Sequence, residues 1–274
     1  MGLPVIDIVF KQLAVSAIQR SQRSVAAIII QDDTSATAGY DIYKYEKDLP
    51  TAGYTAENLA AIKRCFLVAV NKIIVVHVPT TGKLADALNI LEGLVYTYVC
   101  SLIPDSQQEL ANYLISKNAN SKGKKYIGVV AAATTADSKY IINVKNAQVH
   151  DIATKAWIAM VNYLPRLTSL LANLPMNRSA TYYVLEDIDG VDQTFITTEN
   201  DVDSWIDKGF FVLIQDEDVI RVGRGVNSLT TLTSTDSADM KKIIIVESMN
   251  IILEDIYNTF KNDYVGHYKN YPDN

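Results

Sequence analysis

Residues 72–103, KIIVVHVPTTGKLADALNILEGLVYTYVCSLI, contain the pattern from which the fold is predicted. The β-branched run Lys72–Val78 predicts a strand, residues 83–94 a helix, and the apolar run 97–103 a second strand. The expected apolar face of this helix consists of Leu84, Leu88, Leu91 and Val95. Both strand runs are continuously apolar, which is typical of strands buried on both faces of a parallel sheet. The stretch therefore predicts one βαβ unit.

The same alternation of strands and helices extends to both sides of this unit. Strands are predicted at 26–31 and 126–132, a half-exposed strand at 40–45, and helices at 55–70 and 107–117, with Thr55 as the N-cap of the first helix. Together these segments predict an α/β fold with a mixed, mainly parallel sheet that carries helices on both faces.

The second half of the chain mixes helices with antiparallel strands, so the fold is expected to be α+β overall. A long helix is predicted over 152–174, with Asp151 as its N-cap and a kink or break at Pro165. Further segments are predicted as a strand at 180–185, a helix at 198–208, a hairpin of 210–214 with 219–222, a strand at 242–246 and a helix at 249–260.

Residues 1–25 differ from the rest of the chain. Apolar and polar positions partly alternate up to Phe10, and a polar run follows at 20–24. Pro4 and the β-branched residues oppose a helix. We therefore predict an extended N-terminal arm.

The composition argues against several kinds of partner. The chain has 25 Lys and Arg against 31 Asp and Glu, a net charge of −6. A nucleic-acid partner is not expected, because phosphates require a basic face. Membrane insertion is not expected either, because no apolar stretch reaches the roughly 18 residues of a membrane helix. Cys65 and Cys100 lie in apolar segments and are expected to be buried thiols.

The sequence shows no spacing of residues typical of a catalytic, cofactor or metal site. Residues 223–228, GRGVNS, are similar to a dinucleotide fingerprint, but β-branched residues follow where that fingerprint needs a helix. We interpret this stretch as a glycine-permitted turn in which Arg221 and Arg224 make ion pairs or interface contacts. The acidic residues 186–192 lack the glycine spacing of a calcium loop and are interpreted as a solvated turn.

Several longer segments carry a resemblance to a known family. They are residues 2–10 of the arm, the polar run 20–24, YTAEN at 54–58, LLANLPMNRSATY at 170–182, RGVNSLTT at 224–231, and the stretch 249–266. The most specific is RGVNSLTT, and NRSATY at 177–182 is second. On these segments the chain resembles contractile tail sheath proteins of Gram-positive phages and prophages, a type also used by R-type bacteriocins.

The resemblance implies a structural protein without enzymatic activity. Such proteins stack as hexameric rings around an inner tube, and contraction of the sleeve drives the tube through a cell envelope. The implied partners are other copies of the chain, the inner tail tube protein, and baseplate and terminator proteins. The subunit is expected to be made in the host cytoplasm and incorporated into the tail or bacteriocin particle.

The resemblance also implies an organisation into domains and a set of assembly residues. An arm at 1–25 is expected to precede an α/β body at 26–235. Residues 236–274 are expected to begin a C-terminal α+β domain that faces the tube and is cut short, because related sheaths continue through a further helix and a C-terminal arm. The implied assembly residues are Leu3, Pro4, Ile6, Ile8 and Phe10 of a donated strand, together with Arg221, Arg224 and Asn227.

Two other classes of function remain open at this point. The strand and helix alternation alone is compatible with an α/β enzyme or a nucleotide-binding domain of a type that the motifs do not identify. A soluble regulatory or adaptor module is the third possibility, which binding of a defined partner without self-assembly would favour.

Overall fold

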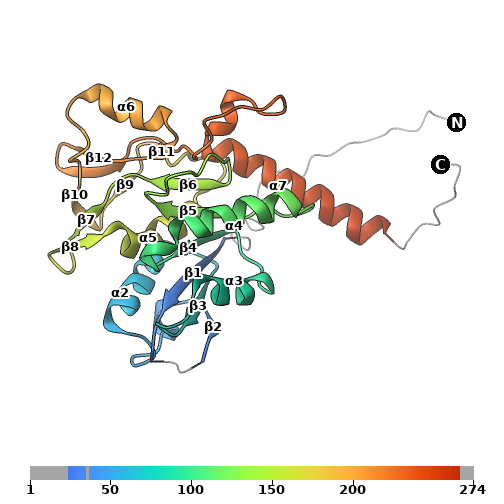
Figure 1. Cartoon of the computed structure of the whole chain (residues 1–274), viewed down its shortest axis with the longest axis horizontal. Coiled ribbons are helices and arrows are strands. Elements are labelled where there is room, and N and C mark those ends of the chain that lie inside the picture. The colour runs from blue at the N-terminus through green and yellow to red at the C-terminus, as the bar shows by residue number, and fades with distance from the viewer. Residues whose placement is uncertain (1–23, 35–36, 266–274) are drawn as a thin grey trace, which may run out of the picture.

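The computed structural model describes residues 24–34 and 37–265. Its centre is a seven-stranded sheet with helices on both faces, in the strand order β11-β6-β5-β4-β1-β3-β2 (Figure 1). The strands are β1 (Val25–Gln31), β2 (Gly39–Tyr43), β3 (Lys72–Val78), β4 (Tyr98–Ser101), β5 (Ile127–Ala131), β6 (Ile141–Val144) and β11 (Phe210–Phe211). All neighbours pair in parallel except β2, which runs antiparallel to β3 at one edge. The predicted mixed, mainly parallel sheet is confirmed.

The two faces of the sheet form two separate cores. One contains Ile28 and Ile30 of β1 and is covered by α2 (Ala56–Arg64) and α5 (Met160–Asn173). The other contains Ala27 and Ile29 and is covered by α3 (Leu84–Glu92) and α4 (Gln107–Asn120). Burial of each β1 isoleucine stabilises the fold by about 1.5–3 kcal/mol. This is why the strand is apolar at every position from Val25 to Ile30 and does not alternate.

The carboxyl end of β1 is occupied by the protein's own carboxylate. Asp32 is 1% exposed. It accepts hydrogen bonds from the backbone N–H of Thr55 at 2.8 Å, the Asn58 amide at 2.8 Å and the backbone N–H of Thr34 at 3.0 Å. Burial by itself raises the pKa of Asp32, but these donors outweigh it and hold the pKa well below its usual range.

This carboxylate lies where a doubly wound domain binds its ligand. The chain crosses from one side of β1 to the other between β3 and β4, and such switch points hold nucleotides in related α/β folds. A bound phosphate would meet the N-terminus of the helix after β1, which is α2. Thr55, the confirmed N-cap of α2, donates its hydroxyl to Asp32 at 3.1 Å. The crevice is therefore closed by an internal anion, which argues against the nucleotide-binding alternative.

The second half contains two small antiparallel sheets that pack beside the large one. Their orders are β10-β7-β8 and β12-β13-β9. The strands are β7 (Gln148–Asp151), β8 (Ala156–Ala159), β9 (Val184–Leu185), β10 (Ile188–Val191), β12 (Leu213–Asp216) and β13 (Val219–Val222). The predicted helix at 198–208 is confirmed as α6 (Glu199–Asp207). The predicted hairpin is confirmed as β12–β13, but residues 210–211 of its predicted first strand belong to β11 of the large sheet.

The predicted helix over 152–174 is wrong in its first third. Residues 148–159 form the β7–β8 hairpin, and α5 begins at Met160. The reason is local: Asp151 accepts the Thr154 backbone N–H at 3.0 Å and so stabilises a turn, and it does not cap a helix. Pro165 neither breaks nor splits α5, because the helix is buried against the sheet from Tyr163 to Ala172.

Other predictions also need correction. The predicted strand 242–246 is the first turn of α7 (Ile243–Thr259), because Ile243 and Val246 are buried on one side of a helix. Val95 does not belong to the apolar face of α3, which ends at Glu92, and its side chain is 61% exposed. The acidic stretch 186–192 is not a solvated turn, because it contains β10 and Asp187 accepts from Arg166 at 3.1 Å.

The shorter helical turns are 3-10 segments at Glu46–Asp48, Cys65–Leu67, Pro104–Ser106 and Ala238–Lys241 and a π-turn at Phe260–Tyr264. The predicted arm falls almost wholly on residues 1–23, which lie outside the described residues.

Replacing the internal anion tests its role in folding. Asp32→Ala leaves the donors of Thr34, Thr55 and Asn58 without their acceptor, so we expect a loss of about 1–3 kcal/mol in the free energy of unfolding in urea. The lowered pKa means that this contribution is present at neutral pH and is lost only in acid, below the unfolded pKa of about 3.9. The exposed Asp203→Ala on α6 is the matched control, and an equal urea midpoint for both variants would contradict the role assigned to Asp32.

Candidate assembly surface

Residues 223–242, the connecting segment, join β13 to α7 and contain the RGVNSLTT stretch. The segment has no regular structure until the 3-10 turn Ala238–Lys241, but hydrogen bonds hold it along much of its length. At its two ends, the carbonyl of Gly225 accepts the Ile243 backbone N–H at 3.0 Å, and Val226 forms an isolated antiparallel bridge with Lys242. The segment is therefore a loop that returns on itself before α7 begins.

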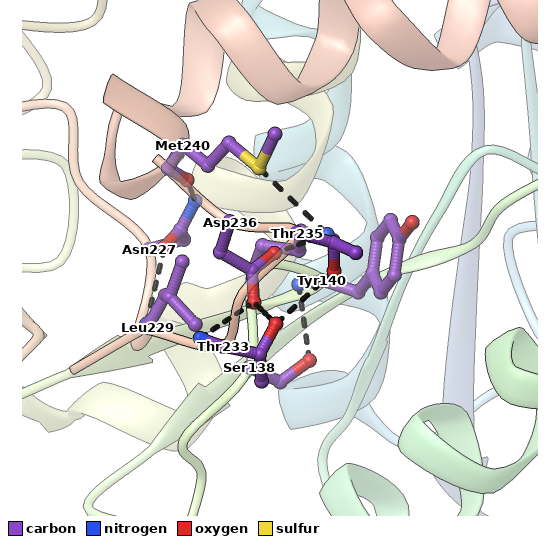
Figure 2. Close-up of polar contacts among 9 residues, drawn as sticks. Ser138, Tyr140, Asn227, Leu229, Thr233, Thr235, Asp236 and Met240 are labelled. Atoms are coloured by element: carbon purple, nitrogen blue, oxygen red, sulfur yellow. Dashed lines mark hydrogen bonds and ion pairs between the residues drawn. The ribbon is translucent and has the colours of Figure 1, made fainter. Parts of the chain in front are cut away.

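Asn227 closes this loop. Its side-chain amide donates to the carbonyl of Met240 at 2.7 Å, and its side-chain oxygen accepts the Leu229 backbone N–H at 3.1 Å (Figure 2). The residue is 1% exposed. Its amide therefore acts inside the subunit, and it can affect assembly only through the segment that it holds.

A charged pair attaches the same loop to the large sheet. Lys139, just before β6, contacts Asp236 at 2.7 Å. The Thr233 hydroxyl donates to the same carboxylate at 2.6 Å (Figure 2). The Lys139 ammonium and the Thr233 donors lower the pKa of Asp236 to about 2. The carboxylate is therefore charged at neutral pH.

The residues before Lys139 hold the middle of the segment. Asp137 accepts the Thr230 backbone N–H at 2.6 Å and the Thr231 backbone N–H at 3.1 Å. The Ser228 hydroxyl donates to the carbonyl of Ser138 at 3.0 Å, and its backbone N–H donates to the carbonyl of Ile141 at 2.8 Å. Partial burial by itself raises the pKa of Asp137, but the threonine donors outweigh it and lower the pKa.

Arg221 and Arg224 occupy different environments. Arg221 lies on β13, and its Nε is 2.6 Å from Oδ2 of Asp216 on the paired strand β12. The predicted ion pair is thus found within the subunit, and it braces the β12–β13 hairpin. Arg224 is exposed and lines a surface pocket of about 160 Å³ with Asp207 and Lys241. Of the predicted residues that the structure describes, Arg224 is the one whose side chain is most available to a partner.

The remaining predicted assembly residues belong to the N-terminal arm. Leu3, Pro4, Ile6, Ile8 and Phe10 lie outside the described residues.

Among the residues that are described, no cluster of His, Cys, Asp and Glu could hold a metal ion, and no helix is long and apolar enough to span a membrane. Cys65 and Cys100 are both free thiols at 0% exposure, and burial raises their pKa values.

Comparison with known proteins decides the family. The model of the phage tail sheath protein central domain matches residues 77–228, from the end of β3 into the connecting segment. The tail sheath protein of Clostridium phage phiCD119 is 30% identical over 283 residues, which cover 100% of this chain and 76% of that protein. This chain belongs to the phage tail sheath family. It is therefore a structural subunit of a contractile tail and not an enzyme.

Solved sheath structures share the fold at low identity. The sheath tail protein of Listeria innocua is similar with a TM-score of 0.75 at 14% identity, over 88% of this chain and 78% of that one. The helical sheath of the anti-feeding prophage in its contracted state gives a TM-score of 0.68 at 12% identity, over 99% of this chain and 79% of that one.

Sequence reasoning missed the partners that hold the connecting segment of this sheath subunit. Lys139 and Asp236 are 97 residues apart, and Ser138 and Ser228 are 90 residues apart. No local pattern relates residues at such distances. The one available signal was the RGVNSLTT motif, which identified one side of the contact.

Loss of the Asn227 amide should loosen the loop. Asn227→Ala removes two buried hydrogen bonds, so we expect a destabilisation of about 1–3 kcal/mol in urea unfolding. Backbone N–H groups of residues 226–242 should also exchange faster with deuterium, because local opening becomes easier. The exposed Asn200→Ala on α6 serves as the matched control, and unchanged exchange in 226–242 would show that Asn227 does not hold the loop.

Proposed function

We propose that this subunit polymerises as stacked hexameric rings into a sleeve around an inner tail tube, and that contraction of the sleeve drives the tube through a cell envelope. The observation that carries the proposal is the 30% identity with a tail sheath protein over the whole chain. Further support comes from the anti-feeding prophage relative, which is described as a helical sheath in a contracted state.

The proposed link between subunits is strand addition by the N-terminal arm. Leu3, Pro4, Ile6, Ile8 and Phe10 would form the donated strand, with main-chain hydrogen bonds for affinity and alternate side chains for register. A strand could be added at a sheet end, and β2 in the large sheet and β8 in the β10-β7-β8 sheet are two of the described strands that lie there. Each has an exposed large side chain, Ile42 at 47% and Trp157 at 52%.

The other partners follow from the same proposal. Baseplate and terminator proteins would hold the two ends of the sleeve, and synthesis would take place in the host cytoplasm before incorporation into the particle. Residues 26–235 would act as the body and 236–274 as the start of a tube-facing domain. The extended sleeve would have the higher free energy, and small gains at many interfaces would sum to the work of contraction.

Electron microscopy of concentrated, purified protein tests the proposal directly. Rings or tubes are the expected result. Ile8→Asp should leave the monomer folded and abolish their formation, because a charge in the donated strand opposes burial in a neighbour's sheet. Gln12→Asp adds the same charge outside the donated strand and should still polymerise. Tubes formed by Ile8→Asp would show that the arm is not the link.

The exposed arginine provides a second test. If Arg224 contacts an acidic group of a neighbouring subunit, Arg224→Glu should slow the growth of tubes, followed by light scattering, by at least about tenfold, since juxtaposed like charges cost several kcal/mol. The urea midpoint of the monomer should not change, because the side chain is exposed. Lys63→Glu, an equal charge reversal at an exposed position of α2, is the control. Equal growth rates for both variants would remove Arg224 from the interface.

A further inference from the structure

A lysine ammonium lies among three aromatic rings where α6 meets the end of the large sheet. The Nζ atom of Lys145 is 3.9 Å from the ring centroid of Trp205. It is also 5.5 Å from the centroids of Phe195 and of Phe210. All three distances are within the roughly 6 Å over which the face of a ring attracts a cation. We call these three rings the aromatic cage.

The rings of the cage come from three parts of the chain and support one another. Phe195 follows β10, Trp205 lies on α6, and Phe210 begins β11. The Trp205 ring is nearly perpendicular to both others, at 86° to Phe195 and 82° to Phe210. Its indole N–H also donates to the carbonyl of Phe195 at 3.4 Å. Edge-to-face packing of this kind is favourable, so the cage is held together by its own rings.

The position of the Lys145 ammonium shows that the cage attracts its charge. The residue directly follows β6, and its backbone N–H donates to the carbonyl of Phe211 at 3.0 Å. A lysine that only covers apolar surface rests its methylene groups on that surface and extends its ammonium into water. Here the ammonium itself lies close to the Trp205 ring.

A carboxylate adds to the attraction. Burial by itself raises the pKa of Asp192, but hydrogen bonds from Thr194 and Ala147 together with the charge of Lys145 outweigh it and lower the pKa. Aromatic cages recognise ammonium groups that carry alkyl substituents. We propose that Phe195, Trp205 and Phe210 form a binding site for an alkylammonium ion, which the subunit fills with its own Lys145.

The site lies beside the connecting segment. Gly209, at the end of α6, has a φ of +80°, and a Cβ there would lie 2.9 Å from the carbonyl oxygen of Ser228. A surface pocket of about 480 Å³ is lined by both residues and by Phe210, so it borders the cage. A small ion can therefore approach the cage from the surface.

The bound cation has a structural consequence for α6. Trp205 attaches the helix to the cage, and Asp207 of the same helix lines the pocket of Arg224. Emptying the cage should loosen α6 and with it one wall of that pocket. This consequence for assembly rests on the proposed function, whereas the cage itself is formed within one subunit and is tested on dilute protein.

Chemical replacement of the lysine side chain tests the site. Lys145→Ala removes three methylene groups and the ammonium, which n-propylammonium supplies again. In a Trp157→Phe background, where Trp205 is the single tryptophan, n-propylammonium chloride should change the emission of Lys145→Ala with half-saturation at about 1–100 mM. It should also raise the urea midpoint of this variant, because the ion binds the folded state. If the variant is unfolded in buffer, the ion should restore its native circular dichroism.

Matched ligands and variants identify what is bound and where. Potassium chloride controls for ionic strength, and 1-propanol supplies the same carbon atoms without the charge. The response to 1-propanol should be at least about tenfold weaker. Lys145→Met fills the same space with a neutral chain and should not respond. Lys208→Ala removes another ammonium, 4.6 Å from the Trp205 centroid, without emptying the cage, and should not respond either.

Three results would overturn the proposal. Lys145→Ala that shows no saturable response to n-propylammonium, or remains unfolded in its presence, has no alkylammonium site. An equal response to 1-propanol would mean that the vacated space takes up apolar atoms and does not recognise a cation. An equal response of Lys145→Met or Lys208→Ala would place the bound ion outside the cage.

Discussion

The subunit depends on the burial of one strand, β1, on both faces and both edges. Ile28 pairs in register with Val75 of β3 on one side and with Cys100 of β4 on the other. Every β1 residue from Val25 to Ile30 is buried. With both edges hydrogen-bonded, the strand cannot shift without exposing its side chains. The helices must therefore pack on two opposite faces, and two separate cores result.

The same architecture serves binding in many α/β proteins, and this chain uses it differently. At the end of β1 the space beside α2 is filled by Asp32, whose acceptor atoms are satisfied by Thr34, Thr55 and Asn58. A side chain that fills its own binding crevice strengthens the subunit and leaves no place there for a phosphate. The function of this sheath subunit is accordingly expected on its surfaces.

The central βαβ unit could be predicted because its signals are local. A β-branched run, a helical period and a glycine at position 93 are enough to predict β3, α3 and β4. The predicted bounds of these elements differ from the observed ones by at most two residues at each end. The β7–β8 hairpin could not be predicted in this way, because Ala153, Ala156 and Ala159 favour a helix and a single turn around Asp151 overrides them. The start of α7 shows the reverse error, since its isoleucines favour a strand and packing makes them helical. Among the assembly residues, Asn227 was predicted from the RGVNSLTT motif. The burial of its side chain and its hydrogen bond to the Met240 carbonyl depend on tertiary structure and could not be predicted.

The hydrogen bonds of the connecting segment have a mechanical consequence. Ser228 is bonded to Ile141 at the start of β6, and Gly225 is bonded to Ile243 at the start of α7. A load applied to α7 is thus transmitted to the large sheet over a few residues, and little slack is available in the loop. The sheet receives this load at β6, which pairs in parallel with both of its neighbours, β5 and β11, so the force is shared among ladders loaded in shear. In a contractile sheath, such a subunit transmits movement as a stiff element.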